Sequence, residues 1–368
     1  MMDPVATLAA SDASARDEAT VTPPNTAAVL GTVPAHAHVT ANAASPCPRL
    51  LRSLIEWAWL GTAMAFAGPW WWPLDLAGCF RVQYAGLLGL AMVWAAVLRR
   101  WRWAVLALFG VAANGLFIAS LYLPAEMSNA QGPPLSIIHY NVHTSNTRYA
   151  DACAYLRARR PDIVFAQEVN AAWSDALRKG LPDYVMRVEH PREDNFGVAM
   201  LVRVADADQP HVDVLSTKVY DLTGRSADVP VITALVRYQG REVAILSIHT
   251  LPPLGALHAS VRGQMLEAAG RWVVEQRQLG RAAIVVGDLN ITPYNGPMKA
   301  LMREAGLESA AQGRGPMPTF PAYPWAWLVR IPIDHALHTR ELSATRCEVG
   351  PASGSDHLPL EVDLHWRR

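Results

Sequence analysis

The sequence predicts an α+β domain of layered sheets that follows three apolar helices. Two observations carry this prediction. Residues 54–123 contain three consecutive apolar stretches. Residues 134–368 contain many short runs of apolar, β-branched residues with only a few helical patterns between them. Because a parallel barrel would alternate strands and helices strictly, the second pattern favours a layered α+β architecture.

The composition excludes several classes of protein. The chain has 368 residues, with 32 Lys and Arg against 32 Asp and Glu, and 51% of its residues are hydrophobic. Intrinsic disorder of the whole chain would need lower hydrophobicity and a larger net charge. A nucleic-acid coat protein would be basic. Four cysteines are too few for a scaffold built on disulfides.

The N-terminal residues 1–48 are rich in Ala, Thr, Pro, Ser and Asn and show no apolar periodicity. This composition predicts a disordered tail. A secretory signal peptide would begin with basic residues and an early apolar run, and neither precedes Arg49.

Residues 49–123 are predicted to form three transmembrane helices, at about 54–72, 76–98 and 103–123. The third stretch has no charged residue over 21 positions, enough to cross a hydrocarbon core of roughly 30 Å. Glu56 and Arg81 lie near the ends of the first two stretches, where they can reach the interface. Three buried helices of a soluble bundle are the alternative, which the missing polar face of the third stretch disfavours.

The basic residues around these stretches predict the orientation. They precede the first stretch and separate the second from the third: Arg49, Arg52, Arg99, Arg100 and Arg102. The positive-inside rule then places the N-terminus in the cytoplasm and, after three crossings, the C-terminal domain outside it. Residues 124–133 form a Pro- and Gly-containing linker. Its reach of at most about 35 Å keeps the next domain near the membrane.

The C-terminal domain, residues 134–368, has 25 Lys and Arg and 25 Asp and Glu. Its helices are expected at 149–159 and 260–278. Cys153 is expected on the buried face of the first of these helices, so a free thiol is favoured over a disulfide with Cys347. Strands are expected at 136–142, 162–169, 198–202, 229–238, 242–249, 282–286 and 361–364.

Polar residues gather where the predicted strands end. The sequence places them in six clusters: Asn141, Glu168, His249, Asp288 with Asn290, Asp334, and Asp356 with His357. A lone carboxylate at a strand end is usually a turn or cap residue. Six clusters in one domain point instead to a site. Carboxylate and amide oxygens suit Mg²⁺, and histidines beside them suit phosphate binding and proton transfer.

These residues occur in a series of motifs that runs YNV, QE, FGVAM, IHT, GDLN, IDHAL and SDHLP. In this order, over about residues 135–364, the chain resembles the endonuclease/exonuclease/phosphatase superfamily. The three apolar stretches, with PREDNFG and HTLPP, further resemble its membrane-anchored bacterial branch. The resemblance implies a four-layered α/β/β/α sandwich like that of deoxyribonuclease, a site at one edge of the paired sheets, and a place in the bacterial inner membrane.

The resemblance also implies a metal site. Glu168 matches the principal metal-binding glutamate of the family, Asn141 matches the asparagine beside it, and Asp356 matches the second carboxylate on the metal side. The expected ion is Mg²⁺, with Mn²⁺ as the alternative, and one or two ions remain open.

The catalytic residues that the resemblance implies come from the later motifs. Asp288 matches the aspartate that orients or deprotonates the attacking water, and Asn290 the amide that contacts phosphate oxygens. His357 matches the site histidine, Asp334 its carboxylate partner, and His249 the second histidine of the deoxyribonuclease and sphingomyelinase branches. Phosphate-ester hydrolysis needs charge stabilisation, an activated water and help for the leaving group, and these residue types supply them.

Four residues are weaker candidates for substrate binding. If the strand continues past Asn141, His143 and His139 share its face, and His143 is favoured to reach the substrate. Arg192 and Asn195, in PREDN, suit either a pocket wall or a turn, and Arg225 lies in a segment that departs from the family pattern. Thr319–Phe320 resembles a Thr-aromatic element that packs near the site.

The function expected from the sequence is a membrane-anchored, metal-dependent phosphoesterase. Phospholipid headgroups, nucleic acids and small phosphate esters all remain open as substrates, as does the choice between mono- and diesters. Zero net charge disfavours nonspecific nucleic-acid binding. The first alternative is an inactive module that binds or senses a phosphate ligand. The second, a transporter, is disfavoured because the centres of the spans lack charge. No protein partner is implied.

Overall fold

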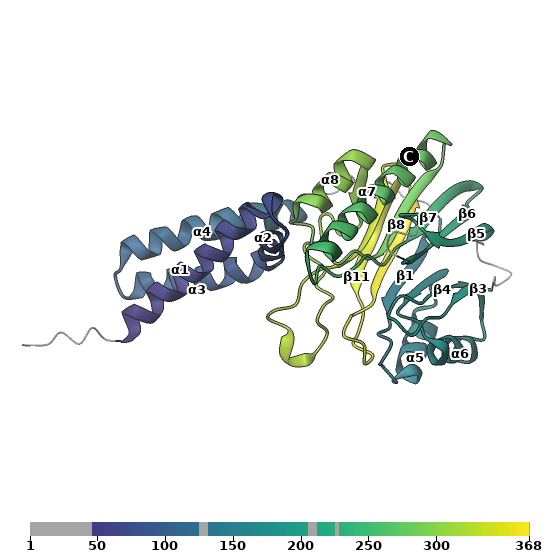
Figure 1. Cartoon of the computed structure of the whole chain (residues 1–368), viewed down its shortest axis with the longest axis horizontal. Helices are drawn as coiled ribbons and strands as arrows, with labels where there is room; N and C mark the ends of the chain where they lie inside the picture. Colours follow the sequence, from purple (N-terminus) through teal and green to yellow (C-terminus); the bar gives the residue numbers. More distant parts are fainter. Residues whose placement is uncertain (1–45, 125–131, 205–211, 225–227, 368) are drawn as a thin grey trace, which may run out of the picture. The chain divides into compact units, whose positions relative to one another are not determined.

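The computed structural model describes residues 46–124, 132–204, 212–224 and 228–367. The predicted tail, most of the linker and Arg225 therefore lie outside the described residues. The first part is helical: α1 (Pro46–Phe66), α2 (Trp72–Ala77), α3 (Arg81–Val97) and α4 (Trp101–Ala119), with 3₁₀ turns η1 (Gly68–Trp70), η2 (Gly78–Phe80) and η3 (Ser120–Tyr122). The three long helices pack side by side (Figure 1). They share a core in which Ile55, Leu88 and Ala107 are fully buried.

Two of the described helical stretches are long and apolar enough to cross a membrane, Trp72–Val97 and Trp101–Tyr122. Their large apolar side chains face outward, and Leu90 and Leu116 are 72% and 74% exposed. A membrane crossing by the first apolar stretch, expected at about residues 54–72, is not confirmed. The first apolar stretch does form a helix, α1, but that helix begins earlier than expected and includes Arg49, Arg52 and Glu56, and these charges lower its hydropathy.

The second part contains two sheets of six strands each. The first sheet has the order β11-β12-β1-β2-β4-β3, and the second β5-β6-β7-β8-β10-β9. Both sheets are mixed, because β1 and β2 are parallel in the first and β7 and β8 in the second, while their other neighbours pair antiparallel. The strands of the first sheet are β1 (Leu135–Asn141), β2 (Ile163–Gln167), β3 (Tyr184–His190), β4 (Val198–Arg203), β11 (Leu342–Val349) and β12 (Leu360–Trp366). Those of the second are β5 (Asp213–Asp221), β6 (Pro230–Tyr238), β7 (Arg241–Ser247), β8 (Ala282–Asp288), β9 (Leu307–Ser309) and β10 (Asp334–Thr339).

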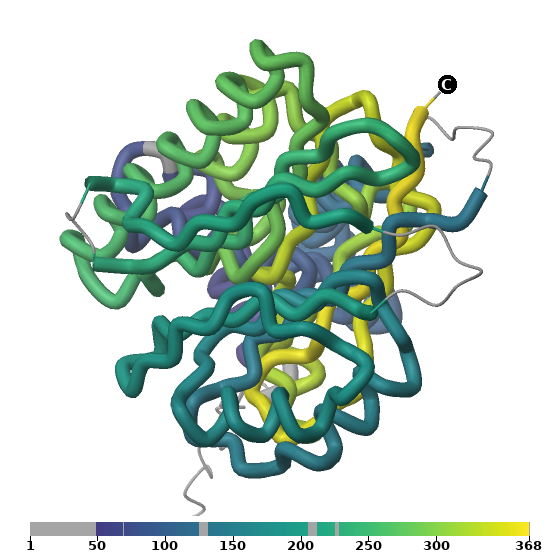
Figure 2. The backbone as a smooth tube through the Cα atoms, turned by 90° about the vertical axis from the view of Figure 1, so that its right-hand side faces the viewer, coloured from purple at the N-terminus to yellow at the C-terminus, as the bar shows by residue number. Residues whose placement is uncertain are grey.

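Three apolar cores show how the layers stack. Buried side chains of both sheets, such as Phe165 and Ile245, meet in one core. A second core joins the outer face of the first sheet to α5 (Tyr149–Arg159) and α6 (Ala171–Gly180). A third joins the second sheet to α7 (Ala256–Gln278) and α8 (Gly296–Ala305). The order is helices, sheet, sheet, helices, as Figures 1 and 2 show, so the expected four-layered α+β arrangement is present.

The strand register brings the predicted site residues to one edge of both sheets. Asn141, at the end of β1, lies opposite Gln167, which ends β2 and precedes Glu168. In the second sheet, Asp334 at the start of β10 lies opposite Asp288 at the end of β8. These strands are buried along nearly all of their length. β2 and β8 are apolar up to the polar residue that ends each strand, and that residue falls at the rim of the core.

All seven predicted strands and both predicted helices are present within a few residues of their expected bounds. The prediction missed β3, β5, β9, β10 and β11, and helices α6 and α8. Within the described residues, Cys153 and Cys347 are free and buried, as the favoured interpretation holds.

Candidate active site

Asp334 is the centre of a buried hydrogen-bonded group. Its Oδ1 lies 2.8 Å from His139 Nε2, and its Oδ2 lies 2.8 Å from His357 Nδ1 and 2.5 Å from Thr319 Oγ1, which donates to it. All four residues are buried. Because both carboxylate oxygens are occupied, Asp334 holds the ring of His357 in one orientation.

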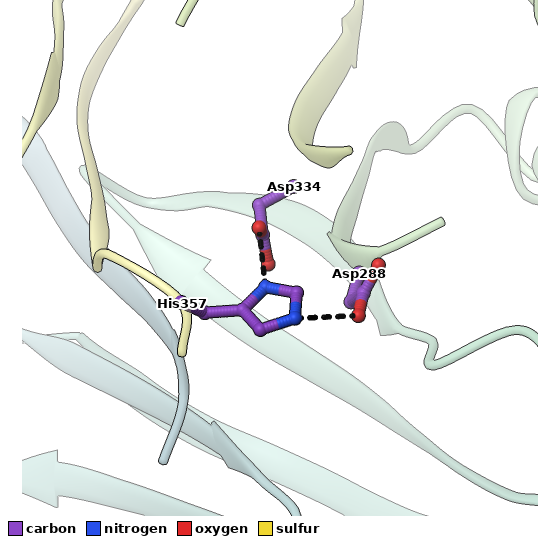
Figure 3. Close-up of side chains that lie close together, drawn as sticks. All are labelled: Asp288, Asp334 and His357. Carbon is purple, nitrogen blue, oxygen red and sulfur yellow. Dashed lines mark hydrogen bonds and ion pairs between the residues drawn. The ribbon is translucent and has the colours of Figure 1, made fainter. Parts of the chain in front are cut away.

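The other nitrogen of His357 faces Asp288 (Figure 3). His357 Nε2 and His249 Nε2 each lie 3.5 Å from the same atom, Asp288 Oδ2. Gly287 permits this approach, since a Cβ there would lie 1.9 Å from the carbonyl oxygen of Ile248, the residue before His249. Two histidines from different loops therefore converge on one buried carboxylate.

The first sheet contributes amide and carboxylate groups beside Asp288. Asn141 Nδ2 donates to Glu168 Oε1 at 2.9 Å and reaches Asp288 Oδ2 at 3.4 Å. Its Oδ1 accepts from the backbone N–H of His143 at 3.1 Å. Thr144 donates through its backbone N–H to Glu168 Oε2 at 3.3 Å. Asn141 thus connects the two sheets at the edge where the site lies.

His143 lies between the two carboxylates predicted to bind metal. Its Nδ1 is 3.4 Å from Glu168 Oε2 and 3.3 Å from Asp356 Oδ1. The strand ends before this residue, and its φ of 61° turns it away from the line of β1. His139 and His143 consequently contact different parts of the site, which corrects the expectation that they share a strand face.

Three residues of the site have a left-handed backbone conformation. Glu168, His143 and Asn290 all have positive φ, at 61°, 61° and 47°. Non-glycine residues adopt this conformation rarely, and it is retained where the surrounding structure fixes it. Asn290 is fixed by three hydrogen bonds: its N–H donates to Asp288 Oδ1, its Nδ2 to the carbonyl of Thr250, and its carbonyl accepts from Arg262.

Burial and charge shift the pKa values of the central groups. Burial raises the pKa of Asp288 to about 8, although His357 opposes the shift. Burial alone would lower the pKa of His357, but Asp334 and then Asp288 raise it to about 10. Burial lowers the pKa of His249 to about 3, and the nearby His357 and His139 act in the same direction. Burial would raise the pKa of Asp334, yet His357 and His139 bring it well below its usual range. Near neutral pH, His357 is therefore a cation and His249 a neutral ring.

The donor set suits a hard divalent ion. Glu168 Oε2 and Asp356 Oδ1 both lie within 3.4 Å of His143 Nδ1. Within the described part of the chain, Asp356 Oδ1 is buried without a hydrogen-bond partner. A second group lies next to it, in which ligand atoms of Asp288, Asp334 and His357 are all within 4.8 Å of one another. Asp334 already accepts three hydrogen bonds, so the first group has more free oxygen capacity for an ion.

The structure brings together eight of the predicted residues: Asn141, Glu168, His249, Asp288, Asn290, Asp334, Asp356 and His357. His143 joins them. The guanidinium of Arg192 pairs with Asp194 and Asp228 of nearby loops, and its part in substrate binding stays a prediction. Asn195 is exposed in the same turn, with φ of 67°.

From the sequence, His139 was ranked below His143 as a site residue, and the residue that Thr319 contacts was not predicted. His139 and Thr319 both contact Asp334 directly. The one available signal for His139 was its position two residues before Asn141 on an apolar strand, where a polar residue facing the core needs a partner.

The fold is thus two mixed sheets between layers of helices, with a set of acids and histidines gathered at one edge of both sheets. The sequence profile of the Endonuclease/Exonuclease/phosphatase family matches residues 138–357. The chain belongs to this family. A comparison with curated protein sequences finds no match.

Solved structures share the fold at low sequence identity. An endonuclease/exonuclease/phosphatase family protein from Bacteroides thetaiotaomicron matches with TM-score 0.51 and 18% identity, covering 65% of this chain and 100% of its own. A family member from Bacteroides vulgatus has TM-score 0.51, 20% identity and coverage of 63% and 99%. A mannosyl-6-phosphatase from Bacteroides thetaiotaomicron has TM-score 0.50, 18% identity and coverage of 63% and 100%.

Proposed function

We propose that this protein is a membrane-anchored phosphoesterase that depends on a divalent metal and hydrolyses its substrate with an activated water. The observation that carries the proposal is the convergence of His249 and His357 on Asp288, with Asp334 fixing His357. Phosphate and a water molecule could meet at this point without a covalent intermediate, and no serine or cysteine nucleophile is needed.

Asp288 is the residue proposed to orient the attacking water and accept its proton. Its raised pKa, about 8, makes its carboxylate a stronger base than an exposed aspartate, and the ionised form that accepts a proton predominates above that pH. His357, cationic and held by Asp334, faces the same carboxylate and stabilises negative charge on the phosphate oxygens. Asn290 and the neutral His249 complete the polar wall of the site, with His249 donating or accepting according to its tautomer.

Glu168, Asp356 and Asn141 are proposed to hold Mg²⁺ or Mn²⁺. When bound, the ion would act as a Lewis acid that stabilises charge on the phosphate and leaving oxygen. Asn141 has a further role that the structure supports independently, since its amide nitrogen holds Glu168 in place.

The membrane is proposed as the location. The N-terminus is proposed to lie in the cytoplasm and the catalytic domain outside it, as in a bacterial inner membrane, and this arrangement requires α1 to cross as well as the two candidate spans. Support comes from Trp72–Val97 and Trp101–Tyr122, whose outward apolar side chains would otherwise face water. The substrate is a phosphate ester of open identity. Nucleic acid is not favoured because the catalytic domain carries no net charge, and no protein partner is proposed.

The test is hydrolysis by the full-length protein in detergent, with Mg²⁺ and with EDTA. The panel is bis-(p-nitrophenyl) phosphate, p-nitrophenyl phosphate, mannose 6-phosphate, plasmid DNA and phospholipid vesicles. Asp288→Asn and His357→Gln are compared with His365→Gln, a change on β12 away from the site. We expect metal-dependent turnover that the first two variants lose and the control keeps. Metal and phosphate binding without turnover on any substrate would instead favour the inactive binding module.

A further inference from the structure

A second buried polar cluster lies where the segment between α1 and α3 contacts the loop that follows Asp288. It consists of Asp75 on α2, Arg262 on α7 and Asn295, which are only 6%, 3% and 3% exposed. Asp75 is distant in sequence from the other two, so the contact joins the helical part of the chain to the catalytic domain. A charged pair buried this deeply is costly unless each member has partners.

Arg262 connects this cluster to the active site. Its Nη2 lies 3.1 Å from Asp75 Oδ2, and its Nη1 donates to the carbonyl oxygen of Asn290 at 2.7 Å. Asn290 is the residue whose N–H holds Asp288 Oδ1 at 2.9 Å. Three hydrogen bonds, through Arg262 and the backbone of Asn290, therefore connect Asp75 to the proposed catalytic carboxylate.

Asp75 also holds the other end of the same loop. Asn295 Nδ2 donates to Asp75 Oδ1 at 2.8 Å and to the carbonyl oxygen of Asp75 at 2.6 Å. The amide oxygen of Asn295 in turn accepts from the N–H of Thr292 at 3.2 Å and from its hydroxyl. One aspartate thus fixes both the beginning and the end of the loop 290–295.

The packing around the cluster leaves little freedom for other arrangements. A Cβ at Gly78 would lie 2.9 Å from Asn295 Nδ2, so a larger residue there would displace the Asn295 amide. Among the described residues, Asp75 is the one acid paired with Arg262. Burial lowers the pKa of the Arg262 guanidinium and Asp75 opposes that shift, so without Asp75 the arginine would have to move toward water.

We propose that Asp75 is a positioning residue of the active site: acting through Arg262 and Asn295, it sets the backbone of Asn290 and the orientation of Asp288. This inference rests on the proposed function for its catalytic consequence. It makes the segment between the apolar helices a part of the active site's framework as well as an anchor. A misplacement of about 1 Å at reacting groups costs on the order of 100-fold in rate.

The test compares Asp75→Asn with Gln312→Ala in the full-length protein in detergent. Gln312 also joins the two parts, donating to the carbonyls of Ser120 and Leu123, but it does not touch the loop 290–295. We expect Asp75→Asn to lower kcat about 10- to 100-fold with a smaller change in KM. In Asp75→Asn, hydrogen–deuterium exchange should become faster in residues 289–295. Gln312→Ala should leave both kcat and this exchange unchanged.

The double variant Asp75→Asn/Arg262→Gln guards against misfolding, since it removes the buried charges together. It should retain the native melting transition and still show faster exchange in residues 289–295. Unchanged exchange in the loop, in either variant, overturns the inference. The exchange readout does not need turnover, so a wild-type protein without activity would contradict the proposed function while faster loop exchange still supported the role of Asp75.

Discussion

The two sheets follow the same plan and deliver different chemistry. Each contains one parallel strand pair joined through a long helix, β1-α5-β2 in the first and β7-α7-β8 in the second. The first sheet presents oxygen ligands at its edge, on Asn141 and Glu168, and the loop before β12 adds Asp356. The second presents Asp288 and Asp334, with His249 after β7. In the proposed function, these similar frameworks carry one half that is proposed to bind the metal and one that is proposed to handle protons.

The difference teaches that the residue at the end of a buried strand decides the chemistry, while the strand itself only sets its place. Several contacts cross between the halves. His139 of the first sheet contacts Asp334 of the second, and Asn141 reaches Asp288. Gln167 accepts from the backbone N–H of Asp288, and His357, from the loop before β12, contacts Asp334 and Asp288. If the division is real, changes in the two halves should affect different kinetic constants, and changes at the crossing contacts should affect both.

The largest effect is expected for Asp288→Asn in the second half. The amide cannot accept the proton of the attacking water, so kcat should fall by roughly 10³-fold, within the range for loss of a general base. The metal concentration for half-maximal activity should change little. Steady-state kinetics over a Mg²⁺ titration measures both constants. A large rise in the metal requirement would contradict the division.

Glu168→Gln in the first half should give the opposite pattern. Loss of the charged oxygen should raise the metal concentration for half-maximal activity by about 10- to 100-fold, judging from the effects of weaker changes around metal sites. High Mg²⁺ should restore much of kcat. Isothermal titration of metal into the protein provides a readout without turnover, and unaltered metal affinity would remove Glu168 from the ligand set.

His139→Leu tests a crossing contact. It leaves Asp334 Oδ1 buried without its hydrogen-bond partner, so unfolding free energy should fall by about 1–3 kcal/mol. His357 loses part of its support, and kcat should fall about 10-fold at saturating metal. His139→Gln keeps a hydrogen-bond donor and is the matched variant. It should retain more of the unfolding free energy and more of kcat than His139→Leu does. Equal loss in the two variants would show that packing, and not the hydrogen bond, is what His139 supplies.

The buried strands and the motif residues of the site could be predicted from the sequence. The distant residues that hold the site in place could not. Strands such as β2 and β8 are buried on both faces and appear in the sequence as apolar runs. β5, whose residues are half-buried or exposed along its length, has no such signature. The motif residues at strand ends were found by position. Asp75 and Arg262 were not, because their contact joins residues 187 positions apart and neither lies in a motif. Pairing at that distance depends on how finished layers pack, which local sequence does not encode.

The smallest effect is expected for His338, a histidine inside β10 rather than at the edge. It is buried, its Nδ1 lies 3.1 Å from the carbonyl oxygen of Thr339, and burial lowers its pKa. A histidine whose folded pKa lies below its unfolded value near 6.5 binds fewer protons in the folded state. Its contribution to stability is thus complete above about pH 6.5 and is lost as the pH falls toward the folded pKa.

The variant His338→Asn should therefore lose less stability than the wild type between pH 7.5 and pH 5. The expected difference is at most about 1.4 kcal/mol per pH unit, because one group accounts for it. His249 and His335 also have lowered pKa values, so part of the acid sensitivity should remain. Urea unfolding at a series of pH values measures the slope, and kcat at pH 7.5 should stay near the wild-type value. An identical slope in the two proteins would show that His338 is not held neutral, and a large loss of kcat would show that chemistry extends beyond the sheet edge.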